Sequence, residues 1–156
     1  MRGWLLDTNV IAALSAPNGA ASVKAWASVQ EEARLYLSVL TLAEYDKGIH
    51  QLTDDDPQRI RYAALRDAIA SRFADRVIPV INAIMRRWGA LAGRIKRDLG
   101  HPPAVIDTLL AATAIEAQLY LVTRNTKDFQ HTGAAVFNPW EEDPVNFAVT
   151  DRPSRR

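Results

Sequence analysis

The sequence has no cysteine, so disulfide bonds and thiolate chemistry are excluded, and any metal ion must be held by oxygen or imidazole ligands. It has no apolar run of the roughly 18 residues that a membrane span needs, because the uncharged N-terminal stretch is broken at residues 16–20, APNGA. No signal peptide is expected, since only a few apolar residues separate Arg2 from Asp7. The net charge of +1 gives no bulk attraction to nucleic acids. We expect a cytoplasmic protein without a membrane segment.

The composition is that of an ordinary globular protein. The 156 residues are 48% hydrophobic and 24% charged, which suits a single hydrophobic core. No internal repeat and no linker divides the chain. We therefore expect one domain over residues 1–147 and a frayed C-terminal tail over residues 148–156.

Short apolar segments alternate with longer helical patterns. Strands are predicted at residues 3–6, 35–40, 76–81, 120–124 and 134–139. Helices are predicted at residues 10–14, 20–32, 41–52, 57–74, 82–99 and 104–118. Thr41 with Glu44 three residues later is typical of a capping box. Asp56 before Pro57 predicts a helix start, and Gly100 predicts a helix end. The alternation predicts an α/β fold with a mainly parallel sheet.

Four acidic residues fall at or near the predicted strand ends. Asp7 follows the first strand, and Glu44 lies in the first turn of the helix after the second. Asp128 lies just beyond a later strand, and Asp107 begins the helix that leads into that strand. Ligands of open α/β sheets bind at the carboxyl ends of the strands, so these acids are expected to converge there. Converging carboxylates repel one another unless a cation compensates them, and Mg²⁺ or Mn²⁺ is the cation that prefers such oxygen ligands.

Each acid also has a simpler explanation. Asp7 could cap the following helix or form an Asx-turn, and Asp128 could be an ordinary turn residue. Glu44 could belong to the capping box with Thr41. Asp107 could be a first-turn acid favoured by the helix dipole. The combination of the four, and not any one of them, favours a metal site.

Other candidate ligands fit less well. Zinc would need paired histidines, and the three histidines are scattered: His50, His101 and His131. Asp46 lies about 200° round the helix from Glu44. Glu116 lies about 180° round the helix from Asp107. Both acids are therefore expected to face solvent.

Four segments then carry a family resemblance: LLDTNVI (5–11), LSVLTLAEYDKGI (37–49), IDTLLAATA (106–114) and LVTRNTKDF (121–129). They resemble the motifs of the PIN-domain nucleases, and among them the VapC-like toxins of bacterial and archaeal toxin–antitoxin pairs. They occur in family order and span nearly the whole chain. VFNPW at residues 136–140 resembles the usual ending of the FitB-like group.

This resemblance implies a three-layer α/β/α sandwich with a small central sheet, and Mg²⁺- or Mn²⁺-dependent cleavage of RNA. It places the family's acids on Asp7, Glu44 and Asp107. Many members have an aspartate where this chain has Asn125, while others have an asparagine there and an acid before the phenylalanine, as in this chain before Phe129. The fourth acidic role is therefore assigned to Asp128, and its neighbour Asn125 could still supply an amide oxygen or order a water. It also implies a homodimer and a DNA-binding antitoxin partner of the VapB or FitA type.

Phosphodiester hydrolysis needs an activated water and neutralisation of charge at phosphorus. Asp7 and Asp107 are expected to anchor the metal ion. Glu44 and Asp128 are expected to hold its waters or a second ion, and either could accept the proton of the attacking water. Residues expected to orient these acids are Thr8, Asn9, Ser38, Thr123 and Asn125.

Basic residues are expected to bind the RNA backbone, and these are Arg86, Arg87, Arg94, Lys96, Arg97, Arg124 and Lys127. For residues 86–97, a solvated helix face is the alternative. No aromatic platform for stacking single-stranded bases is evident, so no sequence preference is predicted.

Three other functions compete with the nuclease hypothesis. A haloacid-dehalogenase phosphatase needs a second acid where this chain has Asn9, which argues against it. A receiver-like signalling module would bind Mg²⁺ beside a strand-end aspartate, but it usually carries an adjacent acidic pair, and this chain has one acid there. A PIN-like binding protein with weakened catalysis is suggested by Asn125 alone.

Overall fold

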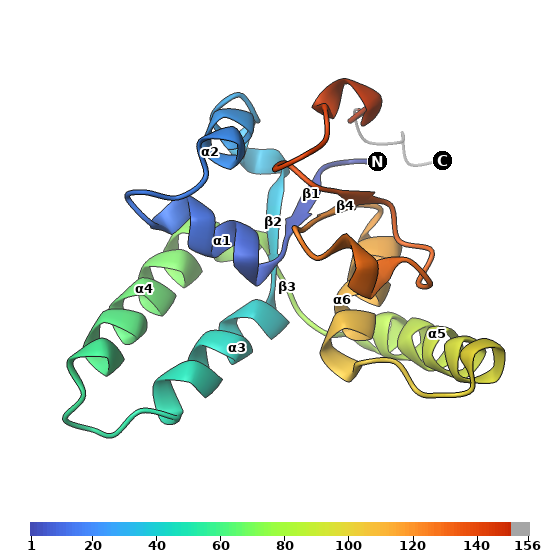
Figure 1. The fold of residues 1–156 in the computed structure, drawn as a ribbon, viewed down its shortest axis with the longest axis horizontal. Coiled ribbons are helices and arrows are strands. Elements are labelled where there is room, and N and C mark those ends of the chain that lie inside the picture. Colours follow the sequence, from blue (N-terminus) through green and yellow to red (C-terminus); the bar gives the residue numbers. More distant parts are fainter. Residues whose placement is uncertain (151–156) are drawn as a thin grey trace.

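The computed structural model describes residues 1–150 (Figure 1). Its strands form one parallel sheet in the order β3-β2-β1-β4-β5. The strands are β1 (Trp4–Leu6), β2 (Leu35–Ser38), β3 (Val77–Ile78), β4 (Tyr120–Val122) and β5 (Val136–Phe137). The central β1 pairs with both β2 and β4, and Trp4 lies opposite Leu35 on one side and Tyr120 on the other.

Helices connect the first four strands as parallel pairing requires, whereas the link from β4 to β5 contains only a 3₁₀ turn. The α-helices are α1 (Thr8–Ser15), α2 (Ala21–Ser28), α3 (Val39–His50), α4 (Pro57–Phe73), α5 (Asn82–Leu99) and α6 (Val105–Ala117). Short 3₁₀ turns are η1 (Glu32–Arg34), η2 (Ala74–Arg76), η3 (Thr126–Phe129) and η4 (Pro144–Asn146). As predicted, Asp56 caps α4 with Pro57 at its first turn, and α5 ends at Gly100. Gly100 has a φ of 82°, a left-handed conformation that favours glycine.

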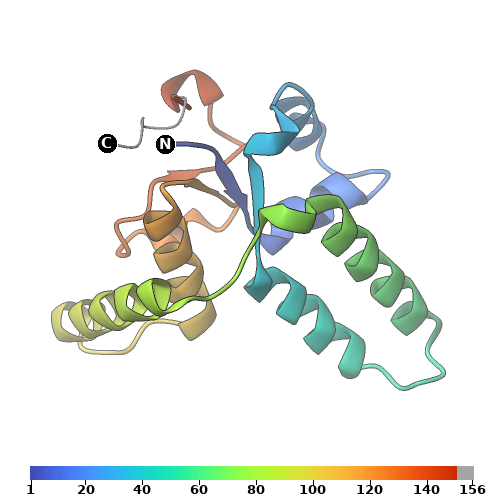
Figure 2. The same cartoon turned by 180° about the vertical axis from the view of Figure 1, so that it is seen from behind.

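The two faces of the sheet are covered by different helices, which confirms the predicted three-layer α/β/α architecture (Figures 1 and 2). Alternate residues of β1 point to opposite faces. Trp4 and Leu6 pack in a cluster with residues of α1, α2 and α4. Leu5 packs in a second cluster with residues of α6, such as Leu110. Helix α5 in turn packs against α6.

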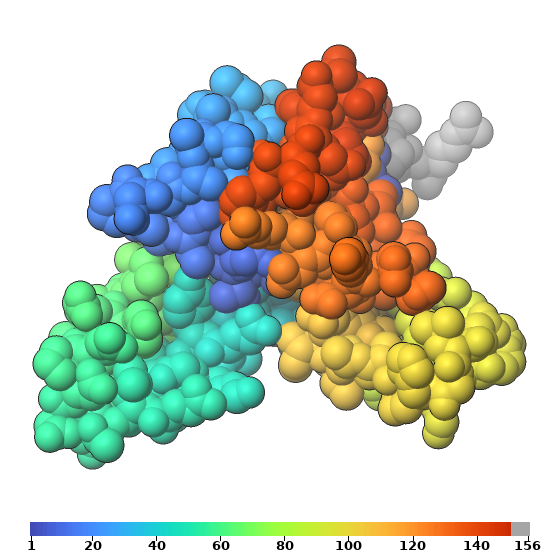
Figure 3. Space-filling model, viewed as in Figure 1, coloured from blue at the N-terminus to red at the C-terminus, as the bar shows by residue number. Residues whose placement is uncertain are grey.

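Two pairs of helices extend away from the sheet as separate arms. Helix α3 packs against α4, and α5 packs against α6. The space-filling view shows an open notch between the arm of α3 and α4 and the arm of α5 and α6 (Figure 3). This notch lies on the side of the sheet where the strands end.

Several predicted element boundaries were wrong. The segment 76–81 is a strand only at Val77–Ile78, the segment 134–139 only at Val136–Phe137, and the helix predicted at 20–32 ends at Ser28.

Two more strands were also predicted too long. The segment 35–40 leaves the strand after Ser38, because Val39 already starts α3. The segment 120–124 leaves the strand after Val122. Both strands therefore end earlier than the apolar pattern suggested. The residues that follow them begin a helix or a loop at the carboxyl ends of the strands.

The predicted tail begins against the body of the domain. The hydroxyl of Tyr120 donates to the Ala148 carbonyl at 3.0 Å. The Thr150 amide donates to the Met1 carbonyl at 3.0 Å. The remainder of the predicted tail, residues 151–156, lies outside the described residues. In residues 1–150, no helix is both long and apolar enough to cross a membrane.

Candidate active site

The strand order places the predicted acidic residues at one edge of the sheet. Asp7 directly follows β1, Glu44 comes from α3 after β2, and Asp128 lies in η3 after β4. The Asp7 amide donates to the Val122 carbonyl at 3.0 Å, so β1 and β4 stay paired up to the first of these acids. Asp107 lies in the first turn of α6, which belongs to the arm on the other side of the notch.

The Asp7 carboxylate is held by three neighbours. One oxygen, Oδ1, accepts the Thr8 amide at 2.7 Å, which caps α1. The other, Oδ2, accepts the Thr123 hydroxyl at 2.8 Å and the Asn9 side-chain amide at 3.3 Å. The helix-cap interpretation of Asp7 is therefore correct, but it uses only one oxygen. The second oxygen is oriented by a residue from another strand end.

Glu44 is not part of a capping box. The helix starts at Val39, and the hydroxyl of Ser38 caps it by accepting the Leu40 amide at 3.1 Å. Thr41, the predicted cap, is buried in the first turn. The prediction failed because Ser38, at the end of the strand, already has the extended backbone that an N-cap residue needs. Glu44 is instead exposed and accepts a hydrogen bond from the Thr8 hydroxyl.

The expected orienting residues divide into three groups. Thr8, Asn9 and Thr123 contact the acids directly, as described above. Asn125 acts one step further away, because its main-chain amide donates to the Thr123 hydroxyl oxygen at 3.1 Å. The Ser38 hydroxyl, by contrast, caps α3 and forms no hydrogen bond with the acids within residues 1–150.

The electrostatics link all four acids. Burial raises the pKa of Asp7, and the charges of Glu44 and Asp128 raise it further, against the lowering effect of the Thr123 hydrogen bond. Burial likewise raises the pKa of Asp107, and Asp128, Asp7 and Glu44 each add to the increase. The charges of Glu44 and Asp128 therefore act on both Asp7 and Asp107, which places the four carboxylates in one electrostatic environment.

This donor set suits a hard divalent cation. All four groups offer oxygen ligands, and their mutual repulsion would be relieved by positive charge. Within residues 1–150, no three acidic or histidine side chains form a ready-made ligand set for one ion. Mg²⁺ is often bound through one or two carboxylates and keeps several waters. Two half-buried carboxylates, Asp7 and Asp107, with two exposed ones beside them, fit that pattern.

The acids that helix geometry excluded are engaged elsewhere. Asp46 forms an ion pair with Arg66 of α4. Glu116 forms an ion pair with Arg87 at 2.6 Å. Neither contributes to the raised pKa values of Asp7 and Asp107.

The predicted basic residues differ in how free they are. On α5, Arg87 is paired with Glu116 and Arg97 with Asp98, while Arg94 donates to the His131 carbonyl. All seven are exposed, and those whose side chains form no hydrogen bond or ion pair within residues 1–150 are Arg86, Lys96, Arg124 and Lys127. Part of the basic helix is thus locally neutralised, which weakens the case for it as a continuous RNA-binding stripe.

One aromatic residue near this edge was missed by the sequence reasoning. The Arg124 guanidinium lies over the ring of Trp140, 5.5 Å from its centroid. The sequence signal for this residue is the VFNPW segment that contains Trp140.

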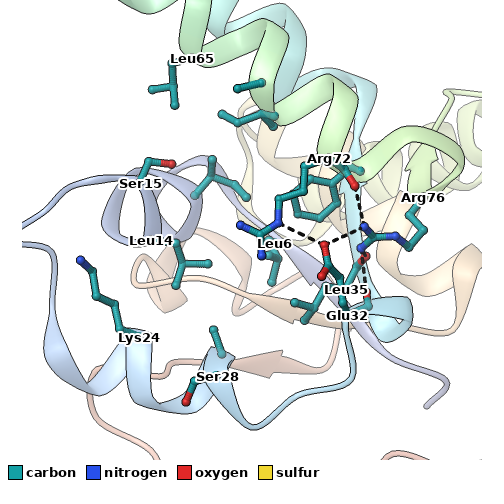
Figure 4. A pocket seen from close by; sticks show the side chains of 15 residues that line it. Leu6, Leu14, Ser15, Lys24, Ser28, Glu32, Leu35, Leu65, Arg72 and Arg76 are labelled. Carbon is teal, nitrogen blue, oxygen red and sulfur yellow. Dashed lines mark hydrogen bonds and ion pairs between the residues drawn. The ribbon is translucent and has the colours of Figure 1, made fainter.

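A separate cavity of about 380 Å³ lies among α1, α2, η1 and α4 (Figure 4). Its walls are mainly apolar, and none of the four acids lines it. Glu32 lies at its rim and accepts hydrogen bonds from Arg72 at 3.1 Å and Arg76 at 3.4 Å. Lys24 adds a third cation to the lining, so the cavity carries more positive than negative charge.

Comparison with known proteins agrees with this architecture. The PIN domain family model matches residues 4–135. The toxin FitB of Neisseria gonorrhoeae is 32% identical over 138 residues, covering 88% of this chain and 99% of that protein. The VapC ribonuclease Y4jK of Sinorhizobium fredii is 31% identical, covering 88% of this chain and 97% of that protein. The structure of FitAB bound to an IR36 DNA fragment matches with a TM-score of 0.77 and 29% identity, over 90% of this chain and 97% of that chain.

The chain therefore belongs to the PIN domain family. Within that family it falls among the FitB- and VapC-type toxins of toxin–antitoxin pairs. This assignment excludes the receiver-like and phosphatase alternatives.

Proposed function

We propose that this PIN-domain toxin is a metal-dependent endoribonuclease that acts in the cytoplasm. The observation that carries the proposal is the convergence of Asp7, Glu44, Asp107 and Asp128 at one sheet edge, where the pKa values of Asp7 and Asp107 are raised. The ribonuclease name of the Sinorhizobium relative supports RNA as the substrate.

In this proposal, Asp7 and Asp107 hold the cation and the two exposed acids act beside it. A bound Mg²⁺ or Mn²⁺ ion would supply positive charge to a phosphate oxygen and lower the pKa of a water. Thr123 keeps Asp7 in one orientation, and Thr8 does the same for Glu44. Glu44 or Asp128 then orients the attacking water and accepts its proton, since both carboxylates are exposed at the edge.

The RNA must approach this acidic edge with the help of nearby cations. Arg124 and Lys127 belong to the same loop as Asp128 and are exposed. Arg86 and Lys96 of α5, which have no ion pair within residues 1–150, would add weaker contacts further from the acids. We infer that the β4–η3 loop provides the main phosphate contacts.

A test compares the wild-type protein with Asp7→Asn on labelled RNA, in Mg²⁺, in Mn²⁺ and with a chelator. Asparagine keeps the helix cap but removes the charge, so we expect cleavage to fall at least about a hundredfold. The matched control is Asp55→Asn, which changes an exposed acid of the loop before α4. If the wild type and Asp7→Asn cleave equally, or if the chelator has no effect, the proposed site is wrong.

We further propose that the protein forms a homodimer and binds a DNA-binding antitoxin protein. The similar FitAB structure contains a DNA fragment, which supports this kind of partner. The apolar cavity among α1, α2 and α4, with its excess of cations, suits an antitoxin segment that carries apolar and acidic side chains.

This docking site can be tested with the antitoxin encoded next to the gene. Ser28→Trp would fill the cavity from its exposed lining and should weaken the complex in size-exclusion chromatography. Ser22→Trp is the matched control, because Ser22 is also exposed on α2 but does not line the cavity. Equal effects of the two variants would contradict the location. The dimer is tested by the sedimentation of the toxin alone.

A further inference from the structure

Arg124 differs from the other arginines that stack on aromatic rings. Arg2 lies over Tyr36 but donates to the Ala117 carbonyl. Arg76 lies over Phe73 but donates to three main-chain carbonyls. Throughout residues 1–150, the guanidinium of Arg124 has no such acceptor and no acidic partner, and it is exposed. Its stacking therefore leaves every N–H donor available.

The main chain of Arg124 is tied to the acidic edge. It directly follows Thr123, whose hydroxyl donates to Asp7. Its amide donates to the side-chain oxygen of Asn9 at 3.2 Å, and the side-chain nitrogen of Asn9 donates to Thr123 at 3.1 Å. The position of Arg124 is thus set by the same side chains that orient the Asp7 carboxylate.

Hydrogen bonds of the following turn and apolar packing fix the position of Trp140. The side-chain oxygen of the buried Asn138 accepts the Trp140 amide at 3.0 Å. The carboxylate of Glu142 accepts the Asn138 amide at 2.6 Å, which closes the turn. The body of Trp140 packs against the apolar cluster on the α1 and α2 face of the sheet. The indole is therefore a fixed support that lies beyond the family match, which ends at residue 135.

Stacking and phosphate binding use different parts of a guanidinium group. The ring covers its face, whereas its N–H donors lie in the plane and can bind two phosphate oxygens together. A planar cation whose face is supported, and whose edge is free beside an acidic site, is arranged to receive a phosphate. A phosphate there would carry no base identity, so the contact would not depend on sequence.

We propose that Arg124 binds a backbone phosphate of the RNA next to the cleaved bond, and that Trp140 is the residue that positions Arg124 for this contact. The inference rests on the proposed ribonuclease function. It adds a positioning residue outside the acidic set.

The test measures the binding of a fluorescein-labelled RNA oligonucleotide to full-length protein that carries Asp7→Asn. Arg124→Ala should weaken binding about tenfold and reduce the slope of log affinity against log salt by about 0.7. Trp140→Ala should weaken binding about two- to fivefold, and Trp140→Phe less, because a phenyl ring still supports the cation. Arg61→Ala and Trp88→Phe are matched controls on α4 and α5, and they should leave binding unchanged.

A double-mutant cycle separates positioning from a general loss of structure. If Trp140 acts through Arg124, then Trp140→Ala should have almost no further effect in a protein that already carries Arg124→Ala. An equal effect in both backgrounds would overturn the positioning role. Binding by Arg124→Ala as tight as by Arg61→Ala would overturn the phosphate contact. Urea unfolding of each variant shows whether it is folded. If Trp140→Ala is unfolded, the binding affinity of Trp140→Phe still tests the positioning role.

Cleavage assays on the protein with Asp7 restored distinguish this inference from the proposed function. The Arg124 and Trp140 variants should raise KM and change kcat little, as for a contact made equally in the ground and transition states. If the wild type cleaves RNA but neither variant changes KM, the roles of Arg124 and Trp140 are refuted and the ribonuclease proposal stands. Binding losses without any wild-type cleavage would refute the ribonuclease proposal and support the phosphate contact.

Discussion

The two edges of the sheet differ in how their charged groups are satisfied. At the edge where the strands begin, Arg2 donates to the Ala117 carbonyl and to the Tyr36 hydroxyl. Arg34 donates to the carbonyls of Arg2 and Thr150 at 3.4 and 3.2 Å. The first residue of β1, Trp4, contacts other aromatic rings beside them. This edge is closed by interactions within the protein.

The edge where the strands end is built in the opposite way. Asp7 and Asp107 lie near other carboxylates, which raise their pKa values in addition to burial. Arg124 stacks on Trp140 and leaves its donors free. The difference is that the charged groups of the first edge have partners within the protein, whereas the acids and Arg124 of the second edge carry charge that a ligand could balance. Variants at the two edges should therefore affect different measurements.

The largest expected effect is on stability at the closed edge. Trp4→Ala removes a buried ring that contacts Trp26, Tyr120 and Phe137, so the free energy of unfolding should fall by about 3–5 kcal/mol. Urea denaturation measures this change. Trp4→Phe should be milder, because it keeps a ring and removes an indole N–H that has no hydrogen-bond partner among the 150 described residues. A loss below about 1 kcal/mol for Trp4→Ala would show that this edge does not support the fold.

A smaller effect, on activity alone, is expected at the open edge. Thr8→Val removes the hydroxyl that donates to Glu44, so the rate of RNA cleavage should fall about tenfold with little change in stability. Thr8→Ser keeps the hydroxyl and is the control. Equal cleavage rates for Thr8→Val and Thr8→Ser would argue that Glu44 needs no support from Thr8.

The cap of α3 lies at the open edge, but its loss should affect stability and not activity. Ser38→Ala removes the acceptor of the Leu40 amide and should lower the free energy of unfolding by about 1 kcal/mol. Ser38→Asn can still cap the helix and should cost less. Thermal unfolding measures both. If Ser38→Ala is as stable as the wild type, the helix is capped in another way.

The smallest effect concerns pH and the metal-free protein. Because the pKa of Asp7 is raised above its ordinary value of 3.8, the native state binds more protons than the unfolded state just above that pH. This carboxyl therefore lowers the stability of the wild type as the pH rises through its native pKa. Asp7→Asn avoids that loss.

The measurement is a series of denaturation midpoints between acidic and neutral pH, with a chelator present. The advantage of Asp7→Asn over the wild type should grow as the pH rises, and Asp55→Asn should show no such trend. Addition of Mg²⁺ should raise the wild-type midpoint by mass action. If the difference in denaturation midpoint between Asp7→Asn and the wild type is the same at every pH, the pKa of Asp7 is not raised in the native state.

Local patterns predicted most of the fold. The ends marked by Asp56 and Gly100 were correct, because capping depends on neighbouring residues. The α/β class and the parallel sheet were correct, because the alternation of short strands with helices favours parallel pairing. The capping box of Thr41 and Glu44 was wrong for a local reason as well. Two adjacent segments could each supply a cap, and Ser38 at the strand end was the one used.

Asp7, Glu44 and Asp128 were selected from the sequence by their positions after strands, and Asp107 by its place at the start of a helix and by the family resemblance. Their catalytic roles stay predictions. What the sequence by itself determined was where strands and helices form, since apolar spacing and capping act within a few residues. Only the tertiary structure decided that Thr8 holds Glu44, that Thr123 holds Asp7 and that Trp140 supports Arg124. These pairs join residues far apart in the chain, and they meet because the sheet order β3-β2-β1-β4-β5 brings separate strand ends to one edge.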